Sequence, residues 1–177
     1  MALLQTDRLD LRPLHPGDLG AAMKIYKDPV VQEHIASLPN SPEQAWQRIL
    51  MQIGHWTEFD FGLFGVFERQ SGKLIGEAGI AKFRRDLGAD FVDTHEAAWL
   101  FRHEYHGLGF AMEAMEVIIE WAEQQFRPVR SVALIAEANE PSLRLAQKLG
   151  YKRYGICAYK GMHMHKLEKC HRRAGVR

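Results

Sequence analysis

Residues 105–111 read Tyr-His-Gly-Leu-Gly-Phe-Ala and lie between two stretches with contrasting patterns. The residues before them, from about 95 to 103, form a short run typical of a strand. After them, apolar residues recur at helical spacing: Ala111, Ala114, Met115, Ile118, Ile119 and Ala122. The sequence therefore predicts a strand, a glycine-containing turn and the start of a helix in immediate succession.

A helix start of this kind can bind an anion. Its first backbone N–H groups have no partner inside the helix, and the helix dipole adds partial positive charge. Gly107 and Gly109 carry no Cβ atom that would keep a phosphate at a distance. A Rossmann fingerprint is not matched, because its third small residue would fall on Met112, and the Gly-Lys-Ser/Thr of a Walker A loop is missing. The turn alone is compatible with a phosphate site or with a plain tight turn.

The rest of the chain alternates between strand-like and helix-like stretches, which predicts an α/β (α+β) fold in a single domain over residues 1–177. Residues 62–69 and 73–83 should form an antiparallel hairpin around a turn that contains Gly72. A helix should begin after Ser41, which can cap it, and Gln44 would complete a capping box. Its expected core face is Ala45, Trp46, Ile49, Leu50, Ile53 and Trp56.

Composition and charge exclude several classes of protein. The 177 residues are 46% hydrophobic and 25% charged, as in a globular protein, and no apolar run approaches the roughly 18–20 residues that span a membrane. The first 13 residues are too charged for a signal peptide, so a cytoplasmic location is expected. The 23 Lys and Arg against 22 Asp and Glu leave a formal net charge of +1, which does not favour a nucleic-acid partner. Only residues 160–177 are locally basic.

No metal site is expected. The two cysteines, Cys157 and Cys170, do not form a C-x-x-C pair. His163 and His165 would share one face of a strand, but no third ligand accompanies them at a clear spacing.

Around the opening stretch, the sequence resembles the GNAT superfamily of acyl-CoA-dependent N-acyltransferases, and most of all its Rim-type branch of ribosomal-protein N-terminal acetyltransferases. The family's pattern at this turn is Gln/Arg-x-x-Gly-x-Gly/Ala. In this chain its three specified positions are His106, Gly109 and Ala111. Histidine replaces the usual Gln or Arg but can still donate a hydrogen bond to a phosphate. Further stretches resemble the branch in the expected order, so that the resemblance covers residues 6–159 and leaves a final strand and basic tail at 160–177. These stretches are Thr6-x-Arg8-Leu9-x-Leu11-Arg12-Pro13, Gly72-Lys73-Leu74-Ile75-Gly76 and Asn139-x-x-Ser142-x-x-Leu145-x-x-Lys148-Leu149-Gly150-Tyr151.

The resemblance implies a strongly bent mixed sheet with helices on both faces. Two central parallel strands, expected at about 95–103 and 131–138, would splay apart around the thioester of acetyl-CoA. The backbone of residues 100–102 would pair with the pantetheine arm, and an N–H near Leu100 or Phe101 would polarise the thioester carbonyl. The backbone of residues 107–111 would hold the pyrophosphate. Asn139 would hold the pantetheine amides, cap a helix, or both. The expected cofactor-binding residues are Leu100, Phe101, Arg102, His106, Gly107, Leu108, Gly109, Phe110, Ala111, Asn139 and Ser142.

The implied reaction is direct attack of a primary amine on acetyl-CoA, for which a carboxylate must take a proton, directly or through water. Glu96, at the start of a splayed strand, is the first candidate and Glu77 the second; each could instead be an ordinary strand-end carboxylate. Many members carry a Tyr acid where this chain has Ala146, so the resemblance assigns Ser142 to the leaving sulfur. Ser142 could also serve only its own helix.

The resemblance leaves the acceptor open between a protein N-terminus and a small amine, and it is compatible with a homodimer. Acidic residues in the segments 28–61 and 84–94, namely Asp60, Asp86, Asp90 and Asp93, would suit a cationic amine if they line the acceptor side. A non-catalytic acyl-CoA-binding or sensor module is the alternative, because Ala146 replaces the usual acid. A nucleotide-binding enzyme unrelated to CoA is disfavoured by Met112.

Overall fold

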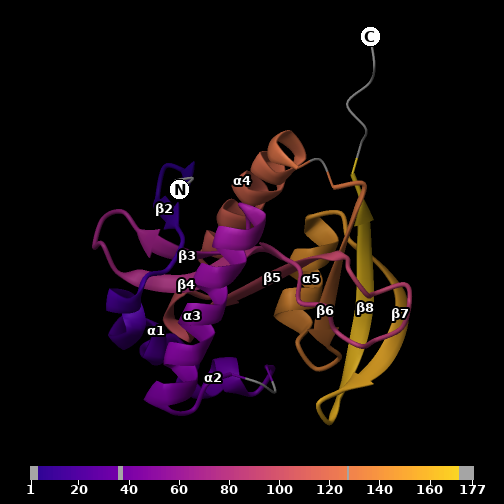
Figure 1. The fold of residues 1–177 in the computed structure, drawn as a ribbon, viewed down its shortest axis with the longest axis horizontal. Helices are drawn as coiled ribbons and strands as arrows, with labels where there is room; N and C mark the ends of the chain where they lie inside the picture. Colours follow the sequence, from indigo (N-terminus) through magenta and orange to yellow (C-terminus); the bar gives the residue numbers. More distant parts are fainter. Residues whose placement is uncertain (1–3, 36–37, 127, 172–177) are drawn as a thin grey trace.

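The computed structural model describes residues 4–35, 38–126 and 128–171 (Figure 1). These residues form one eight-stranded mixed sheet with the strand order β1-β2-β3-β4-β5-β6-β8-β7. The strands are β1 (Leu4–Gln5), β2 (Leu9–Arg12), β3 (Leu63–Glu68), β4 (Leu74–Ala81), β5 (His95–Phe101), β6 (Arg130–Ala136), β7 (Lys152–Tyr159) and β8 (Met162–Cys170). The helices are α1 (Leu19–Tyr26), α2 (Pro29–Gln32), α3 (Pro42–Phe59), α4 (Phe110–Gln125) and α5 (Glu140–Lys148), with 3-10 turns η1 (Pro16–Asp18) and η2 (His103–Tyr105).

The two central strands β5 and β6 run parallel and diverge almost at once. Their register contains only His95 opposite Ser131 and Glu96 opposite Val132. Beyond these positions β5 continues along β4 to Phe101, whereas β6 continues along β8 to Ala136. Neighbouring strands on either side are antiparallel, including the expected β3–β4 hairpin. The predicted pair of splayed parallel strands is therefore confirmed.

Helices cover both faces of the sheet, as predicted (Figure 1). Successive side chains of a strand point to opposite faces, and β5 shows this clearly: Phe101 belongs to one core cluster and Leu100 to the other. The Phe101 cluster contains the apolar faces of α4 and α5, and the Leu100 cluster contains those of α1 and the first half of α3. The site between β5 and β6 is thus held by two separately packed layers.

The helix α3 begins as predicted but buries a narrower face. The Ser41 hydroxyl accepts from the Gln44 N–H at 3.2 Å, and the Gln44 side chain accepts from the Asn40 N–H, one residue before the expected partner. Trp46 is 40% exposed and Leu50 is 45% exposed, so the prediction that both lie in the core is wrong. The helix turns a polar residue inward instead, because Gln52 is buried against β4.

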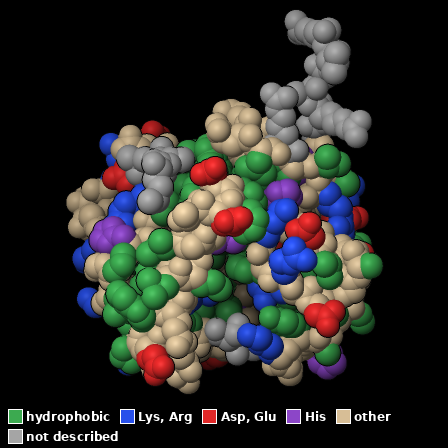
Figure 2. Space-filling model, in the orientation of Figure 1, with side chains coloured by type: hydrophobic (Ala, Val, Ile, Leu, Met, Phe, Trp, Pro, Cys, Tyr) green, Lys and Arg blue, Asp and Glu red, His purple; other side chains and the backbone are tan. Residues whose placement is uncertain are grey.

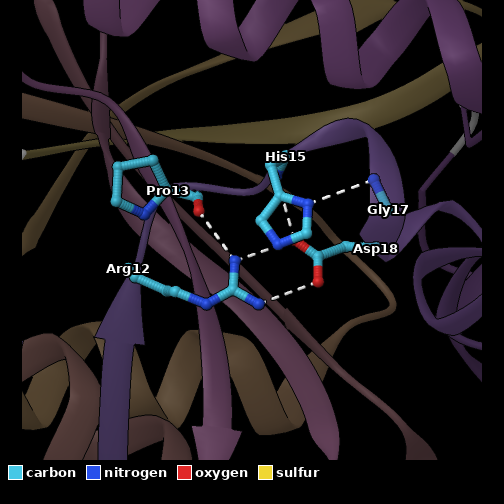
Figure 3. Close-up of polar contacts among 5 residues, drawn as sticks. All are labelled: Arg12, Pro13, His15, Gly17 and Asp18. Carbon is cyan, nitrogen blue, oxygen red and sulfur yellow. Dashed lines mark hydrogen bonds and ion pairs between the residues drawn. The ribbon is translucent and has the colours of Figure 1, made fainter.

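An ion pair joins Arg12, the last residue of β2, to Asp18, the residue before α1 (Figure 3). The Arg12 guanidinium donates to both carboxylate oxygens of Asp18 at 2.8 Å, and the His15 backbone N–H donates to the same carboxylate at 2.9 Å. Burial raises the pKa of Asp18, but these hydrogen bonds outweigh it and hold the pKa below its usual value. The pair therefore stays charged at neutral pH and positions α1, whose last residue, Tyr26, reaches the site described below.

The strand β8 lies within residues 160–177, where a final strand was expected, and the expected basic tail over residues 172–177 lies outside the described residues. At the end of β8, His171 bonds to the Ser131 hydroxyl and to the Glu123 carboxylate, each at 2.7 Å, which ties the strand to β6 and α4. None of the helices in the described residues is long and apolar enough to cross a membrane.

Candidate active site

Two clefts meet where β5 and β6 diverge. The larger, of about 430 Å³, is lined by the glycine turn, the start of α4 and the side of α5, and we call it the glycine-turn cleft. The smaller, of about 140 Å³, is lined by Glu77 and Glu96, and we call it the glutamate cleft. Figure 2 shows the surface hollowed between the part over α3 and the part over β6 and β8. Residues that line both clefts include Trp99, Leu100, Asn139 and Ser142.

The glycine turn presents to the first cleft backbone donors that have no acceptor within the described part of the chain. Gly107 and Gly109 adopt φ values of +73° and +84°, in the left-handed region where a side chain causes strain. The first backbone hydrogen bond of α4 runs from the Glu113 N–H to the Gly109 carbonyl at 3.1 Å. The N–H groups of residues 110–112 therefore precede any helical acceptor, and they face a site with the positive end of a sixteen-residue helix behind it.

Arg8 holds this turn from the side away from the cleft. Its guanidinium donates to the Leu108 carbonyl at 3.0 Å and to the Glu113 carboxylate at 2.7 Å, and it stacks on Phe110 at 4.3 Å. Thr6 donates to the same carboxylate at 2.5 Å. Burial raises the pKa of Glu113, but the bonds from Thr6 and Arg8 lower it further than burial raises it. Arg8 was outside the predicted site, although it belongs to the first resembling stretch.

The backbone of β5 offers fewer free groups than expected. The Arg102 N–H donates to the Ile75 carbonyl, and the Arg102 carbonyl accepts from the Tyr105 N–H, each at 3.0 Å. Both backbone groups of Arg102 are thus used within the chain, and Arg102 lines neither cleft. Because backbone groups alternate in direction along a strand that pairs with β4, the N–H groups of Trp99 and Phe101, and not that of Leu100, point toward the gap.

Two more predicted cofactor residues are placed differently from expectation. The Nε2 atom of His106 donates to the Phe101 carbonyl at 2.8 Å, so this nitrogen holds the turn against β5. The Leu108 side chain is 55% exposed and lines neither cleft. His106 still lines the glycine-turn cleft, together with the other predicted residues Leu100, Phe101, Gly107, Gly109, Phe110, Ala111, Asn139 and Ser142.

Glu77 lies at the wall of the glutamate cleft, and both oxygens of its carboxylate accept hydrogen bonds. Its side chain is 0% exposed, and it accepts from the Tyr26 hydroxyl, from Arg48 Nη2 at 2.8 Å and from Gln52 Nε2 at 2.9 Å. Burial and the neighbouring charge of Glu77 raise the pKa of Tyr26, so its hydroxyl stays protonated and keeps donating. Glu77 is thus built into a network that joins β4 to α1 and α3.

Glu96 lies on the same face of the sheet, since Glu77 pairs with Leu100 and Ala81 pairs with Glu96 in the β4–β5 register. Its side chain is 4% exposed, and its partner is Arg85, whose Nε atom lies 2.8 Å from Oε2. Arg85 also donates to the Tyr159 hydroxyl at 2.7 Å. Burial raises the pKa of Glu96 and the Arg85 charge opposes this, with a net increase. Glu96 therefore binds a proton more readily than an exposed glutamate does, as a general base requires.

Ser142 and Asn139 lie at the junction of the two clefts. The Asn139 side chain accepts from the Ser142 N–H at 3.1 Å, so it caps α5, which is one of its two expected roles. The indole N–H of Trp99 donates to the Ser142 Oγ atom at 3.2 Å. With its oxygen accepting from Trp99, the Ser142 hydroxyl keeps its own hydrogen available for an acceptor in the clefts.

The charges around the glutamate cleft differ from the expected acidic rim. Asp60, Asp86, Asp90 and Asp93 line neither cleft. Asp90 pairs with Lys166 at 2.8 Å and Asp93 with Lys82 at 3.1 Å. The glutamate cleft is lined instead by Arg48, Arg85 and Tyr159, which no pattern in the sequence indicated. Among the described residues, no group of three or more His, Cys, Asp or Glu side chains could hold a metal ion.

Residues 8–152 match the sequence profile of the family described as the acetyltransferase (GNAT) domain. The chain belongs to the GNAT acetyltransferase family. A solved structure from Bordetella pertussis that is assigned to the GnaT-family acetyltransferases shares 33% identity and a TM-score of 0.86, covering 96% of this chain and 100% of that one. The uncharacterized N-acetyltransferase YnaD of Bacillus subtilis is 27% identical over 161 residues, 89% of each chain.

Solved structures of Rim-type proteins have a similar fold. A Salmonella typhimurium acetyltransferase, described as modifying the N-terminal serine of ribosomal protein L7/L12, has a TM-score of 0.80 over 97% of this chain and 100% of that chain. Its identity is 11%, so this likeness shows the shared GNAT fold. GNAT acetyltransferases use acetyl-CoA as acetyl donor, and the left-handed glycines and unpaired N–H groups of the glycine-turn cleft fit its pyrophosphate.

Proposed function

We propose that this chain transfers the acetyl group of acetyl-CoA to a primary amine by direct attack, at the junction of the two clefts. The observation that carries the proposal is the gap between β5 and β6, which pair at only two positions. On one side of this gap lie the unpaired N–H groups of α4, and on the other lies the buried carboxylate of Glu96. An anion site and a candidate base therefore flank the same opening.

Both backbone groups and side chains would bind acetyl-CoA. When bound, acetyl-CoA supplies the activated acetyl group. The N–H groups of residues 110–112 and the turn from Gly107 to Gly109 would hold its pyrophosphate, and Asn139 would contact its pantetheine arm. The N–H groups of Trp99 and Phe101 point toward the gap and would polarise a carbonyl oxygen there, an interaction typically worth about 3–4 kcal/mol.

Glu96 is the proposed base. An amine is protonated at neutral pH and must lose a proton before it can attack. Glu96 is buried, has a raised pKa and keeps lone pairs free beside its one partner, Arg85, so it can take this proton directly or through a water molecule. Glu77 already accepts three hydrogen bonds, one of them from a guanidinium, and we assign it the role of holding Tyr26 and Arg48 in place.

Ser142 is the proposed donor to the leaving sulfur. It lines both clefts, and the Trp99 indole bound to its oxygen directs the hydroxyl hydrogen elsewhere. Ala146, which stands at the position of the family's usual Tyr acid, is a fully buried residue of α5 without an ionisable group and cannot serve. The hydroxyl of Ser142 can therefore stabilise the thiolate by a hydrogen bond rather than by full proton transfer.

The proposal is tested by measuring release of the CoA thiol with acetyl-CoA and a panel of amines that includes amino acids, polyamines and peptides with a free N-terminus. We expect thiol release that depends on the amine and that matches the amount of acetylated amine found by mass spectrometry. A non-catalytic acyl-CoA-binding module would instead bind acetyl-CoA, with a rise in melting temperature, and release no thiol with any amine.

A further inference from the structure

The glutamate cleft presents positive rather than negative charge to whatever enters it. Its charged lining residues are two glutamates and two arginines, each pair joined by a hydrogen bond of 2.8 Å. The side chains of Glu77 and Glu96 are 0% and 4% exposed, whereas those of Arg48 and Arg85 are each 20% exposed. The charge that a ligand meets in this cleft is therefore that of the guanidinium groups.

Arg48 retains a donor that nothing in the described part of the chain uses. Its Nη2 atom donates to Glu77, but its Nε atom is buried and has no hydrogen-bond partner there. A buried donor without a partner costs free energy, which an acceptor atom on a ligand would recover. Both oxygens of Glu77 already accept hydrogen bonds, from Tyr26 and from Gln52 and Arg48, which weakens Glu77 as a partner for a cationic ligand.

The same cleft is unfavourable for a polycation. A polyamine or aminoglycoside brings further ammonium groups, and these would meet Arg48 and Arg85, whose side chains are more exposed in the cleft than those of Glu77 and Glu96. The guanidinium groups also favour the neutral form of the reacting amine over its ammonium form, which assists attack. The rim is apolar, with Ile35, Leu38 and Phe83, and the volume of about 140 Å³ suits a molecule of amino-acid size.

We propose that the acceptor is an amine that also carries a carboxylate, of the α-amino-acid type with an apolar side chain, and that Arg48 binds this carboxylate. The proposal rests on the proposed acetyl transfer at this site and narrows its acceptor. A guanidinium recognises a carboxylate through parallel N–H donors, and Arg48 has the Nε donor to give.

The first test is binding of reaction products, which needs no turnover. With CoA present, calorimetry compares N-acetyl-L-leucine with N-acetyl-L-leucinamide, which differ only in the carboxylate. We expect the acid to bind about tenfold more tightly, equivalent to about 1.4 kcal/mol. Equal affinity of the two products, or tighter binding of the amide, would overturn the proposal whether or not the protein turns over.

Variants assign the preference to Arg48. Arg48→Gln should abolish the difference between the two products and leave CoA affinity unchanged. Arg130→Gln is the matched control, because Arg130 also pairs with a carboxylate and is 28% exposed, but lines neither cleft. If Arg48→Gln does not fold, Arg48→Lys keeps the charge and loses the fork of donors, and it should reduce the preference. A full preference in a folded Arg48 variant would contradict the assignment.

Turnover distinguishes failure of this inference from failure of the acetyl transfer. L-leucine should have a kcat/KM about tenfold above that of L-leucinamide, and spermidine and tetra-alanine amide should be poorer still. Equal or better use of L-leucinamide or spermidine would overturn the carboxylate site while supporting acetyl transfer. Thiol release with none of these amines, together with a preference for the acid in the calorimetry, would overturn the transfer and support the carboxylate site.

Discussion

Replacing Glu96 with glutamine removes the proposed base with little change in shape. The glutamine oxygen can still accept from Arg85, which lies 2.8 Å away, so the link between the loop and β5 is kept. Loss of a general base costs about 10²–10⁴ in rate, which is about 2.7–5.4 kcal/mol at 1.36 kcal/mol for each factor of ten. We expect kcat to fall by this amount in Glu96→Gln. Affinity for acetyl-CoA should not change, because Glu96 lines the glutamate cleft and not the glycine-turn cleft.

The assay is the initial rate of CoA thiol release as a function of pH, with acetyl-CoA affinity measured separately by calorimetry. Burial raises the pKa of Glu96, so kcat/KM of the wild type should fall as pH falls through that raised pKa. This acid limb should be absent in Glu96→Gln. Glu77→Gln is the matched control on the same sheet face; it should lower the melting temperature and leave the limb in place. An unchanged kcat in Glu96→Gln, with the acid limb intact, would refute the assignment.

Three further predictions concern the cofactor turn, the leaving group and stability. Gly109→Trp should abolish the rise in melting temperature that acetyl-CoA produces. Leu108→Trp, at an exposed neighbouring position, should keep this rise. Retained acetyl-CoA binding in Gly109→Trp would contradict the placement of the pyrophosphate. Ser142→Ala should lower kcat about tenfold, as loss of a hydrogen bond to a charged sulfur implies, with little change in acetyl-CoA affinity by calorimetry. Burial lowers the pKa of His55, whose Nε2 atom accepts a hydrogen bond from the Lys82 backbone N–H at 2.9 Å. The neutral imidazole therefore contributes stability above about pH 6.5, the ordinary pKa of the unfolded state, and this stability is lost as the pH falls below that value. Denaturant unfolding should show that slope, and His55→Gln should make it shallower.

Much of the fold and part of the site follow from local sequence signals. The glycine turn at Gly107 and Gly109 was predictable because a strand pattern ends and a helix pattern begins on either side of it. The caps of α3 and α5, Ser41 and Asn139, were predictable because their side chains act within their own helices. The splaying of β5 and β6 came only from the resemblance, since no strand pattern reveals which neighbour a strand leaves.

The features that the sequence did not predict depend on contacts between segments that lie far apart in the sequence. Arg8 and Glu113 are 105 residues apart, so their pairing behind the glycine turn has no local signal. Trp46 fits the apolar period of α3 but lies on the solvent side, because the helix turns Arg48 and Gln52 inward to satisfy Glu77. Arg102 was expected to face the cofactor, but the direction of a strand's backbone groups depends on its register with β4, which the sequence does not display.

The most direct test of acetyl transfer is a balance of products in one reaction. Wild-type protein is incubated with acetyl-CoA and an amine, and the CoA thiol and the acetylated amine are quantified together. The structure predicts equal amounts of the two products, formed at a rate that requires the amine and that falls about 10²-fold or more in Glu96→Gln. Saturable binding of acetyl-CoA without any acetylated product across the amine panel would contradict it.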